Sequence, residues 1–429
     1  MPVCRRRYAL LGLGLLCAVI IPCSAEAHST GTDKVLDSLQ PDGDAVTLSE
    51  AAAMHLKVSV PLLRAQQLLK QHQFGAALEM LAQIDAVPER SKAENDALET
   101  LRIIAASDAD QPAVAAKSYD GLTAIGSLSP VQRMNFADDI ASAYFRASDY
   151  PATIVWANRS LAEGNTEARL KSLLAQAYYF TNDFANAAKT AAELIAAEER
   201  DGQAVTESQR QILANSTIKL GDPRQAINAL ESLVAAVPKP EYWSVLIRRV
   251  AAQPGFPSPL AIDIGRLRLA VGAFTTADDY VDLAQQALQA GFPAEARLVL
   301  AKGIAAGRLD AHQSLRDTAE KQAADDLKSL PASSREAEQQ KTGQGLVNTG
   351  QEAVFLGQTE QGLAQIERGL AKGGLKSPEY AQIHLGEAYL LAGQAETAKE
   401  AFHHVGETGI AGDLARLWLI TLGETPVHP

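Results

Sequence analysis

A 34-residue repeat is the feature that most constrains how this chain can fold. Tyr144 and Tyr178 lie 34 residues apart, and the residues around them match in register. The matching sets are Ile140, Ala141, Tyr144 and Tyr150 in the first copy and Leu174, Ala175, Tyr178 and Phe184 in the second. A period of this length is typical of one helix–turn–helix unit, which buries its apolar face only by stacking on neighbouring units. The repeat therefore predicts an all-α solenoid and makes a binding surface the central functional question.

The first 27 residues are expected to be an export signal outside this fold. Three arginines at positions 5–7 precede an apolar run over residues 9–21, and the small-x-small sequence at 25–27 follows. These are the three parts of a secretory signal peptide. The apolar run is also shorter than the roughly 20 residues that a membrane helix needs. We expect cleavage before His28 and a periplasmic mature chain.

Cysteine and charge narrow the functional classes. Cys4, Cys17 and Cys23 are the only cysteines and all lie in the signal segment, so the mature chain has no disulfide or thiolate chemistry. A lipoprotein is a weaker alternative, because larger residues precede Cys17 and Cys23 where a lipobox has small ones. With 39 Lys and Arg against 51 Asp and Glu, the chain lacks the basic surface that nucleic acid requires. No later stretch approaches about 18 uninterrupted apolar residues, so no transmembrane segment is expected after cleavage.

The remaining chain divides by pattern into four parts. Residues 28–56 are polar and predict a linker or arm, and residues 57–307 carry the N-terminal and central helical repeats. Residues 308–344 are highly charged and predict a connector with one long polar helix and a turn, and residues 345–425 carry the C-terminal repeats. Gly221 lies 39 residues beyond Asn182 at an equivalent turn, which places an insertion of about five residues at 201–207.

Glycine spacing identifies the last two repeats. Gly350, Gly357 and Ile366 align with Gly386, Gly393 and Phe402, which follow 36 residues later. Small residues such as Ala141 and Ala175 allow the two helices of a repeat to approach closely. With these motifs the chain resembles tetratricopeptide-repeat proteins over about residues 60–405, with gaps near 91–130, 243–275 and 308–344. The resemblance implies a right-handed superhelix of helical hairpins.

Several segments are similar to a group of exported repeat proteins of Gram-negative bacteria. They include Tyr242-Trp243, the run at 290–296 and the closing Asp413-Leu414-Ala415-Arg416-Leu417-Trp418. That group has no activity that can be carried over to this chain. The wider family implies a scaffold that holds a peptide or a partner protein in its concave groove.

The expected groove is lined by first-helix residues on the side opposite the small packing residue. In the three central repeats these are Asp138, Ser142, Phe145 and Arg146; Ser172, Gln176, Tyr179 and Phe180; and Gln211, Asn215, Ile218 and Lys219. Aromatic rings beside amides suit an extended peptide, because they offer stacking area and backbone hydrogen bonds. The alternative is that the rings of Phe145, Tyr179 and Phe180 pack on neighbouring helices. Asp138 and Ser172 stand where a carboxylate clamp would need lysine, so capture of a chaperone C-terminus is not expected.

Catalytic patterns are weak. His403 and His404 are adjacent, and neighbouring helical positions point about 100 degrees apart, so they are poorly placed to share one metal. Ser216 and Lys219 form a Ser-x-x-Lys pattern without companion motifs, and the pair Asp138-Asp139 is typical of a solvated helix face.

We therefore expect a non-catalytic scaffold without cofactor or metal that binds an envelope protein or peptide. Two alternatives remain open. One is a glycan-binding accessory or hydrolase of the cell envelope that uses the groove aromatics as sugar platforms. The other is a structural spacer in a multiprotein envelope complex.

Overall fold

The computed structural model describes residues 56–88, 90–309 and 313–426. Throughout these residues the secondary structure is helical and contains no strand, so the predicted all-α class is confirmed. The chain forms two compact units, Met1–Leu170 and Lys171–Pro429, which are described separately below. The predicted signal peptide and the arm up to residue 55 lie outside the described residues. Among the described helices, none combines the length and apolarity needed to cross a bilayer.

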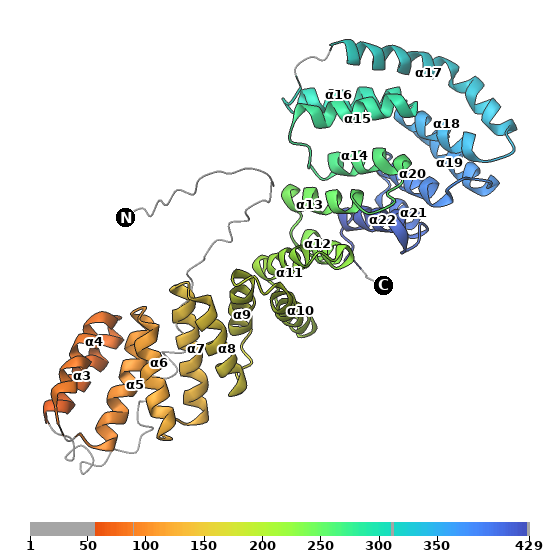
Figure 1. Ribbon diagram of the computed structural model, residues 1–429. Coiled ribbons are helices and arrows are strands. Elements are labelled where there is room, and N and C mark those ends of the chain that lie inside the picture. The colour runs from red at the N-terminus through yellow and green to blue at the C-terminus, as the bar shows by residue number, and fades with distance from the viewer. Residues whose placement is uncertain (1–55, 89, 310–312, 427–429) are drawn as a thin grey trace. The chain divides into compact units, whose positions relative to one another are not determined.

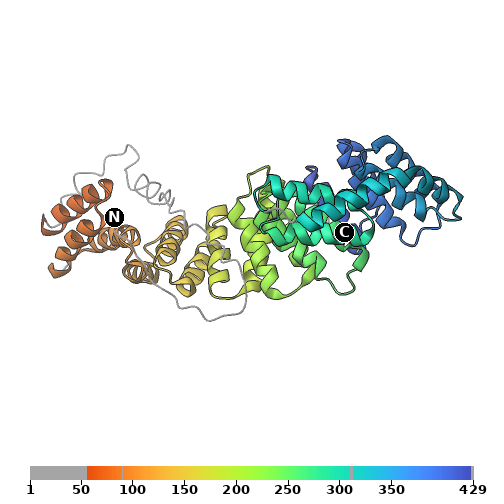
Figure 2. The same cartoon turned by 90° about the horizontal axis from the view of Figure 1, so that it is seen from above.

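The first unit is a row of helical hairpins, and Figures 1 and 2 show its successive helices side by side. Each hairpin pairs a first helix with a second: α3 (Leu56–Lys70) with α4 (Phe74–Ala82) and the short η1 (Gln83–Ala86), α5 (Lys92–Asp108) with α6 (Pro112–Ala124), and α7 (Pro130–Arg146) with α8 (Tyr150–Ala162). The unit ends within α9 (Ala168–Phe180). α5 and α6 form a regular hairpin in the stretch near 91–130, where the resemblance to the repeat has a gap.

Helix starts in this unit follow from local side-chain chemistry. At the start of α5, Glu94 N–H donates to Ser91 Oγ at 3.2 Å, and Ser91 N–H donates to Glu94 Oε2 at 2.7 Å. This reciprocal capping box satisfies two backbone donors that would otherwise lack partners. Ser129 and Gln132 form the same arrangement at α7, where Pro130 adds a fixed φ at the first helical position.

The turns between first and second helices share one backbone signature, a residue with positive φ. The earlier hairpins use non-glycine residues, and the later ones use glycine: His72, Asp110, Ser148 and Asn182, then Gly221, Gly291, Gly357 and Gly393. Asn182 at φ 62° and Gly221 at φ 81° are equivalent, which confirms the 39-residue spacing inferred between these turns. The left-handed conformation ends each first helix and reverses the chain. The same turn across the chain shows that every hairpin is a copy of one unit.

The second unit continues the series after α9. It contains α10 (Phe184–Arg200), α11 (Glu207–Leu220), α12 (Pro223–Ala236), α13 (Pro240–Ala251), η2 (Ser258–Leu260), α14 (Ala261–Ala270), α15 (Ala277–Ala290), α16 (Pro293–Ala305), α17 (Gln313–Gln339), α18 (Gln344–Phe355), α19 (Thr359–Lys372), α20 (Pro378–Leu391), α21 (Ala395–His403) and α22 (Gly409–Thr421). The insertion predicted at 201–207 corresponds to the loop between α10 and α11. The helix α10 also has 17 residues, whereas the equivalent second helix of the preceding hairpin, α8, has 13. Residues 252–257 and η2 separate α13 from α14.

The hairpin of α18 and α19 is held together by close backbone approach at glycines. A Cβ atom at Gly350 would lie 2.7 Å from Gly362 O, and one at Gly362 would lie 2.6 Å from Gly350 O. At the next hairpin, a Cβ at Gly386 would lie 2.5 Å from the Phe402 ring. Only glycine leaves room for these contacts. The sequence analysis aligned Gly350 with Gly386 by spacing, and the structure shows that both lie at close helix contacts.

The long charged segment forms one continuous helix. α17 spans 27 residues and runs through Pro331, so the expected turn is not located there. It packs against α16 and α18 with a row of small buried residues that includes Ala319, Ala323 and Ala337. A row of small side chains lets a mostly polar helix lie close to its neighbours while its charged face remains in water.

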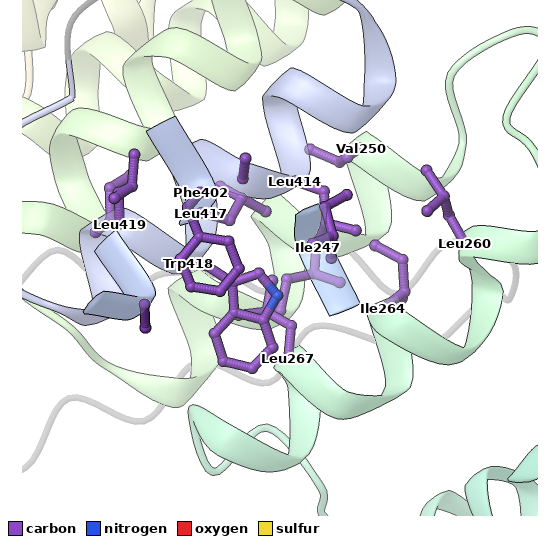
Figure 3. Packing of buried hydrophobic residues seen from close by; sticks show 14 of the residues in the cluster. Ile247, Val250, Leu260, Ile264, Leu267, Phe402, Leu414, Leu417, Trp418 and Leu419 are labelled. Carbon is purple, nitrogen blue, oxygen red and sulfur yellow. The ribbon is translucent and has the colours of Figure 1, made fainter. Parts of the chain in front are cut away.

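The C-terminal helix packs back onto the start of the same unit. Figure 3 shows Leu414, Leu417 and Trp418 of α22 meeting Ile247 and Val250 of α13 and residues of α14 in one apolar cluster. The Trp418 ring stacks on Phe402 of α21 with a centroid separation of 5.8 Å and an interplanar angle of 5°. α22 contacts α12, α13, α20 and α21. The second unit is thus closed by contacts of its last described helix with α12 and α13.

Candidate partner-binding surfaces

In the first unit, the predicted groove residues of α7 are engaged by an arginine from the next hairpin. Arg169 Nη2 lies 2.5 Å from Asp138 Oδ2, and Arg169 Nη1 donates to Ser142 Oγ at 2.9 Å. Asp138 and Ser142 are buried, while the Arg169 side chain is 41% exposed. Arg169 therefore covers two of the predicted contact residues, and a ligand would meet its guanidinium first.

Arg146 makes the equivalent link to the preceding first helix. Its Nε donates to Asp110 Oδ1 at 2.7 Å, and its Nη2 donates to Ser107 O at 2.5 Å at the end of α5. Asp110 is one of the left-handed turn residues, so Arg146 also supports a hairpin turn. The face formed by α5 and α7 is thus a series of arginine–carboxylate links between first helices.

Acidic groups on this face retain protons more readily than usual. Burial raises the pKa of Asp138 despite the neighbouring Arg169. Burial, together with the charges of Asp138 and Asp108, raises the pKa of Asp139 well above its ordinary value. Carboxyl groups in such positions favour the neutral form. We interpret this face as a packed inter-repeat seam.

The predicted groove aromatics pack across the turns of their own hairpins. Phe145 at the end of α7 meets Tyr150 of α8 edge-on, with ring centroids 5.5 Å apart. Tyr179 of α9 makes the same contact with Phe184 of α10 at 5.5 Å, and burial raises its pKa. Phe180, 5.9 Å from Tyr179, is 41% exposed. Phe145 and Tyr179 therefore pack against neighbouring helices, as the alternative to ligand binding supposed. Among the three predicted groove aromatics, Phe180 presents the most surface to a ligand.

In the second unit, Gln211 of α11 lies in a polar cluster that ties α11 to α13. Gln211 Nε2 donates to Glu207 Oε1 at 3.1 Å and also to the hydroxyl of Tyr242. Lys239 Nζ lies 2.7 Å from the same Glu207 oxygen, and Tyr242 donates its hydroxyl to Glu207. Hydrogen bonds from Lys239 and Tyr242 lower the pKa of Glu207. Lys239, Glu207 and Tyr242 were not predicted from the sequence.

The other predicted residues of this unit are more accessible. Ser172, Gln176, Asn215 and Ile218 are half-buried, and Lys219 is exposed. Gln176 shares α9 with Phe180, whereas Asn215 and Lys219 lie on the next first helix, α11. Of the predicted set, the members in this unit keep polar and aromatic surface available. Whether they bind a partner stays a prediction.

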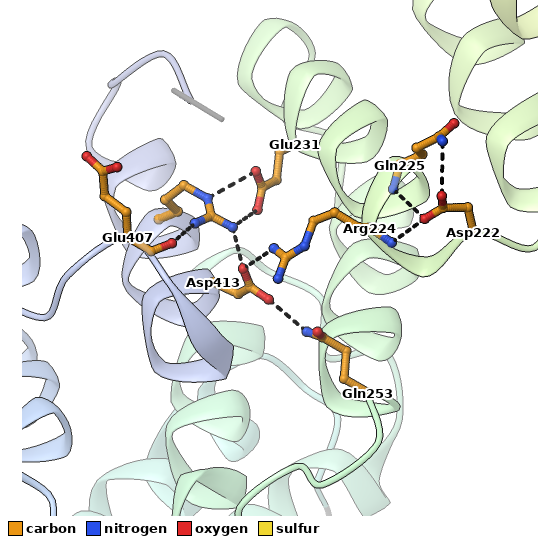
Figure 4. Close-up of polar contacts among 8 residues, drawn as sticks. Asp222, Arg224, Gln225, Glu231, Gln253, Glu407 and Asp413 are labelled. Carbon is orange, nitrogen blue, oxygen red and sulfur yellow. Dashed lines mark hydrogen bonds and ion pairs between the residues drawn. The ribbon is translucent and has the colours of Figure 1, made fainter. Parts of the chain in front are cut away.

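A buried polar cluster that the sequence did not indicate holds α22 to α12 (Figure 4). Asp413 accepts hydrogen bonds from Arg224 at 2.6 Å, from Gln253 at 2.8 Å and from Arg416. Arg416 also contacts Glu231 at 3.3 and 3.4 Å. Asp413 and Glu231 are fully buried. Burial raises the pKa of Glu231, although Arg416 opposes that effect.

A second buried cluster is centred on Arg266 of α14, and the two clusters share a local motif. Asp263 lies three residues before Arg266, and Asp413 lies three residues before Arg416. In both cases the pair lies in a helix of mainly apolar residues. An Asp-x-x-Arg pair on a buried face is the signal that could have located both clusters, since such charges are rarely buried without partners. No group of three or more His, Cys, Asp or Glu residues in the described parts of the chain is arranged to hold a metal ion.

The hairpins of both units define the chain as an all-α protein built from repeated helical hairpins. No protein-family model and no curated protein matches it. Among solved structures, the chain is similar to the Cut9–Hcn1 hetero-tetramer of the APC/C, with 13% identity and a TM-score of 0.25, covering 75% of this chain and 66% of that one.

Two further similar structures are Rap proteins. One is a Rap protein complexed with competence and sporulation factor, with 13% identity, a TM-score of 0.26, and coverage of 84% of this chain and 99% of that one. The other is the apo form of RapI, with 12% identity, a TM-score of 0.23, and coverage of 81% and 86%. Similarity at this level says nothing about what this chain binds.

Proposed function

We propose that this chain is a non-catalytic periplasmic scaffold that captures an extended segment of a cell-envelope protein. The proposed surface is the first-helix face of the second unit, defined by Gln176, Tyr179, Phe180, Asn215 and Lys219. The observation that carries the proposal is Phe180, a large aromatic ring with 41% of its surface exposed. Exposed aromatic anchors beside adaptable polar groups are common at protein-binding surfaces.

The chemistry of the surface supports an extended peptide as the occupant. The amides of Gln176 and Asn215 can each donate to and accept from a peptide backbone, and Lys219 supplies a positive charge. The link between Gln211 and Tyr242 fixes α11 against α13, so this part of the face is preorganised. The export signal predicted from the sequence of residues 1–27 supports the periplasmic location.

Partner capture from an envelope extract, followed by mass spectrometry, tests the proposal. The variant Phe180→Ala with Asn215→Ala should lose the enriched partner, because truncating an aromatic anchor costs about 2 kcal/mol, or roughly thirtyfold in affinity. Phe180 is a better target than Tyr179, whose ring supports the turn to Phe184.

The matched control is Lys189→Ala with Glu193→Ala, two exposed residues on the second helix α10. The control should bind like the wild type, and both variants should keep wild-type helicity. Undiminished capture by the Phe180 and Asn215 variant would remove this surface from consideration. Retention of polysaccharide in place of a protein would favour the glycan-binding alternative.

A further inference from the structure

Arg266 lies at a junction of three helices of the second unit. Its guanidinium contacts carboxylates on each of them: Asp263 of α14 at 2.8 Å, Glu295 of α16 at 2.7 Å through two bonds, and Glu387 of α20 at 2.8 Å. The rings of Phe292 and Phe355 lie 5.5 and 5.4 Å from the guanidinium carbon. Arg266 and Glu387 are 121 positions apart in the chain, so this contact joins distant parts of the unit.

The charges at this junction do not balance. One guanidinium faces three carboxylates, and Asp263, Glu295 and Glu387 are 0%, 3% and 6% exposed. Burying uncompensated negative charge is strongly unfavourable. Other charged groups nearby do not remove the imbalance. His384 of α20 lies 3.4 Å from Asp263, while Glu352 of α18, Asp326 of α17 and the exposed Arg297 of α16 lie on the side of Glu295.

Two oxygens at the junction mark where a proton would reside. Asp263 Oδ2 and Glu387 Oε1 are both buried and receive no hydrogen bond from a donor. A proton on Glu387 would turn that carboxyl into a donor toward Asp263 while its other oxygen still accepts from Arg266. The pKa values of Glu387 and Asp263 shift in opposite directions, as this arrangement requires. Burial and Asp263 raise the pKa of Glu387 well above its ordinary value, whereas His384 and Arg266 outweigh burial and lower the pKa of Asp263.

We propose that the junction of α14 and α20 is a proton-dependent latch, closed while Glu387 carries a proton and opened when that proton is lost. Ionisation of Glu387 would place a third negative charge beside Asp263 and Glu295 in a buried site, and α20 would move away from α14 to hydrate it. The neighbouring Glu352 acts in the same direction, since burial and Asp326 raise its pKa to about 8. Alkaline conditions therefore loosen the closure of the second unit, and this holds whatever partner the unit binds.

Hydrogen–deuterium exchange of the full chain from about pH 6 to about pH 10, corrected for the intrinsic pH dependence of exchange, tests the latch. Peptides from α14 and α20 should lose protection by about tenfold or more as the pH rises. Peptides from α3 and α4 should change little. Constant protection of α14 and α20 across this range would overturn the proposal.

The variant Glu387→Gln isolates the proton. Glutamine keeps the oxygen that accepts from Arg266 and replaces the proton with an amide donor toward Asp263, so α14 and α20 should stay protected at high pH. The matched control is Glu396→Gln on the exposed surface of α21, which should behave like the wild type. Loss of protection in Glu387→Gln equal to that of the wild type would refute a role for this carboxyl.

Infrared difference spectroscopy gives an independent measurement of the proton itself. A protonated buried carboxyl has a carbonyl stretching band that an ionised one lacks. Because Asp139 and Glu352 also have raised pKa values, the band of Glu387 is the part that is present near neutral pH in the wild type, is missing from Glu387→Gln and disappears on the alkaline side in parallel with the loss of protection. Its absence near neutral pH would contradict the latch.

Discussion

Arg224 and Asp413 are 189 positions apart in the chain, yet Arg224 Nη1 lies 2.6 Å from Asp413 Oδ1. This contact joins the second helix of an early hairpin to the last helix of the chain. In an open solenoid each repeat contacts only its neighbours, and stability is close to a sum of local terms. Closure by α22 adds long-range contacts, so we expect the second unit to unfold more cooperatively than a simple repeat array.

Asp413→Ala should destabilise the second unit by about 3 to 5 kcal/mol, because it leaves Arg416 and Glu231 buried with incomplete partners. Urea unfolding followed by tryptophan fluorescence measures this, since Trp243 and Trp418 report on the second unit and Trp156 reports on the first. The matched control is Asp120→Ala, which removes a 2.8 Å pair with Arg159 in which the aspartate side chain is 60% exposed. That change should cost about 1 kcal/mol or less. Similar losses in the two variants would argue against a structural role for the buried cluster.

Gly350→Ala should destabilise the hairpin of α18 and α19, because its Cβ would lie 2.7 Å from both Gly362 O and an Ile366 side-chain carbon. Gly121→Ala in α6 is the control, since a Cβ there meets nothing within 4 Å. Alanine in an open helical position stabilises by about 0.5 to 1 kcal/mol relative to glycine. Thermal unfolding should therefore shift in opposite directions for the two variants. A stabilising effect at Gly350 would show that the helices can separate without loss.

Glu352→Gln should stabilise the protein increasingly as the pH rises from 5 to about 8. The folded-state pKa of Glu352 is about 8 against an ordinary 4.5, so between these values the folded state binds more protons than the unfolded state. Wild-type stability consequently falls as the pH rises through this window, by at most roughly 1.4 kcal/mol per pH unit, and glutamine removes that dependence. The midpoint of urea unfolding at several pH values gives the comparison, with Glu336→Gln on the exposed face of α17 as the control. A pH-independent difference would be inconsistent with a raised pKa.

Asp279→Ala should weaken the start of α15. The Asp279 carboxylate accepts from the backbone N–H groups of Thr275 and Thr276 at 2.8 and 3.0 Å, and it pairs with Arg268. Loss of such a cap costs about 1 kcal/mol. These hydrogen bonds outweigh partial burial and lower the pKa of Asp279 to about 2. The stabilising effect is present above the ordinary pKa of 3.8 and disappears as the pH falls toward 2, so wild type and variant should converge in acid. Thermal unfolding of wild type and variant, measured near neutral pH and again near pH 2, checks this. A difference in midpoint temperature that is as large in acid as at neutral pH would show that the cap does not depend on the ionised carboxylate.

The repeat pattern predicted most of the fold because it reports local chemistry. The spacing from Asn182 to Gly221 located two equivalent turns, and the 36-residue spacing aligned Gly350 with Gly386, since a turn conformation and a missing side chain are properties of single positions. The closure by α22 could not be predicted in this way. Asp413 and Arg224 become partners only through the path of the helices between them, and no local pattern records that path.

The candidate site was predicted less well than the fold, for a related reason. First-helix positions were correctly placed on first helices, but the sequence did not show which of them a neighbour would cover. Arg169 engages Asp138 and Ser142, and Tyr242 engages Gln211. Burial of a polar side chain by the next repeat depends on the stacking geometry. Phe180 and Lys219 remain exposed and keep their place in the proposed surface.

The return of α22 onto α12 also sets the order in which the chain can finish folding. Contacts in the first unit join residues near one another in sequence, so its hairpins can form as soon as they have been synthesised. α12 must wait for α22, because Asp413 lies 189 positions beyond Arg224 in the chain. The second unit therefore reaches its native state only after α22 has been synthesised, and until then α12 and α13 expose the apolar surface that α22 later covers. A chain truncated before α22 would keep that surface exposed permanently.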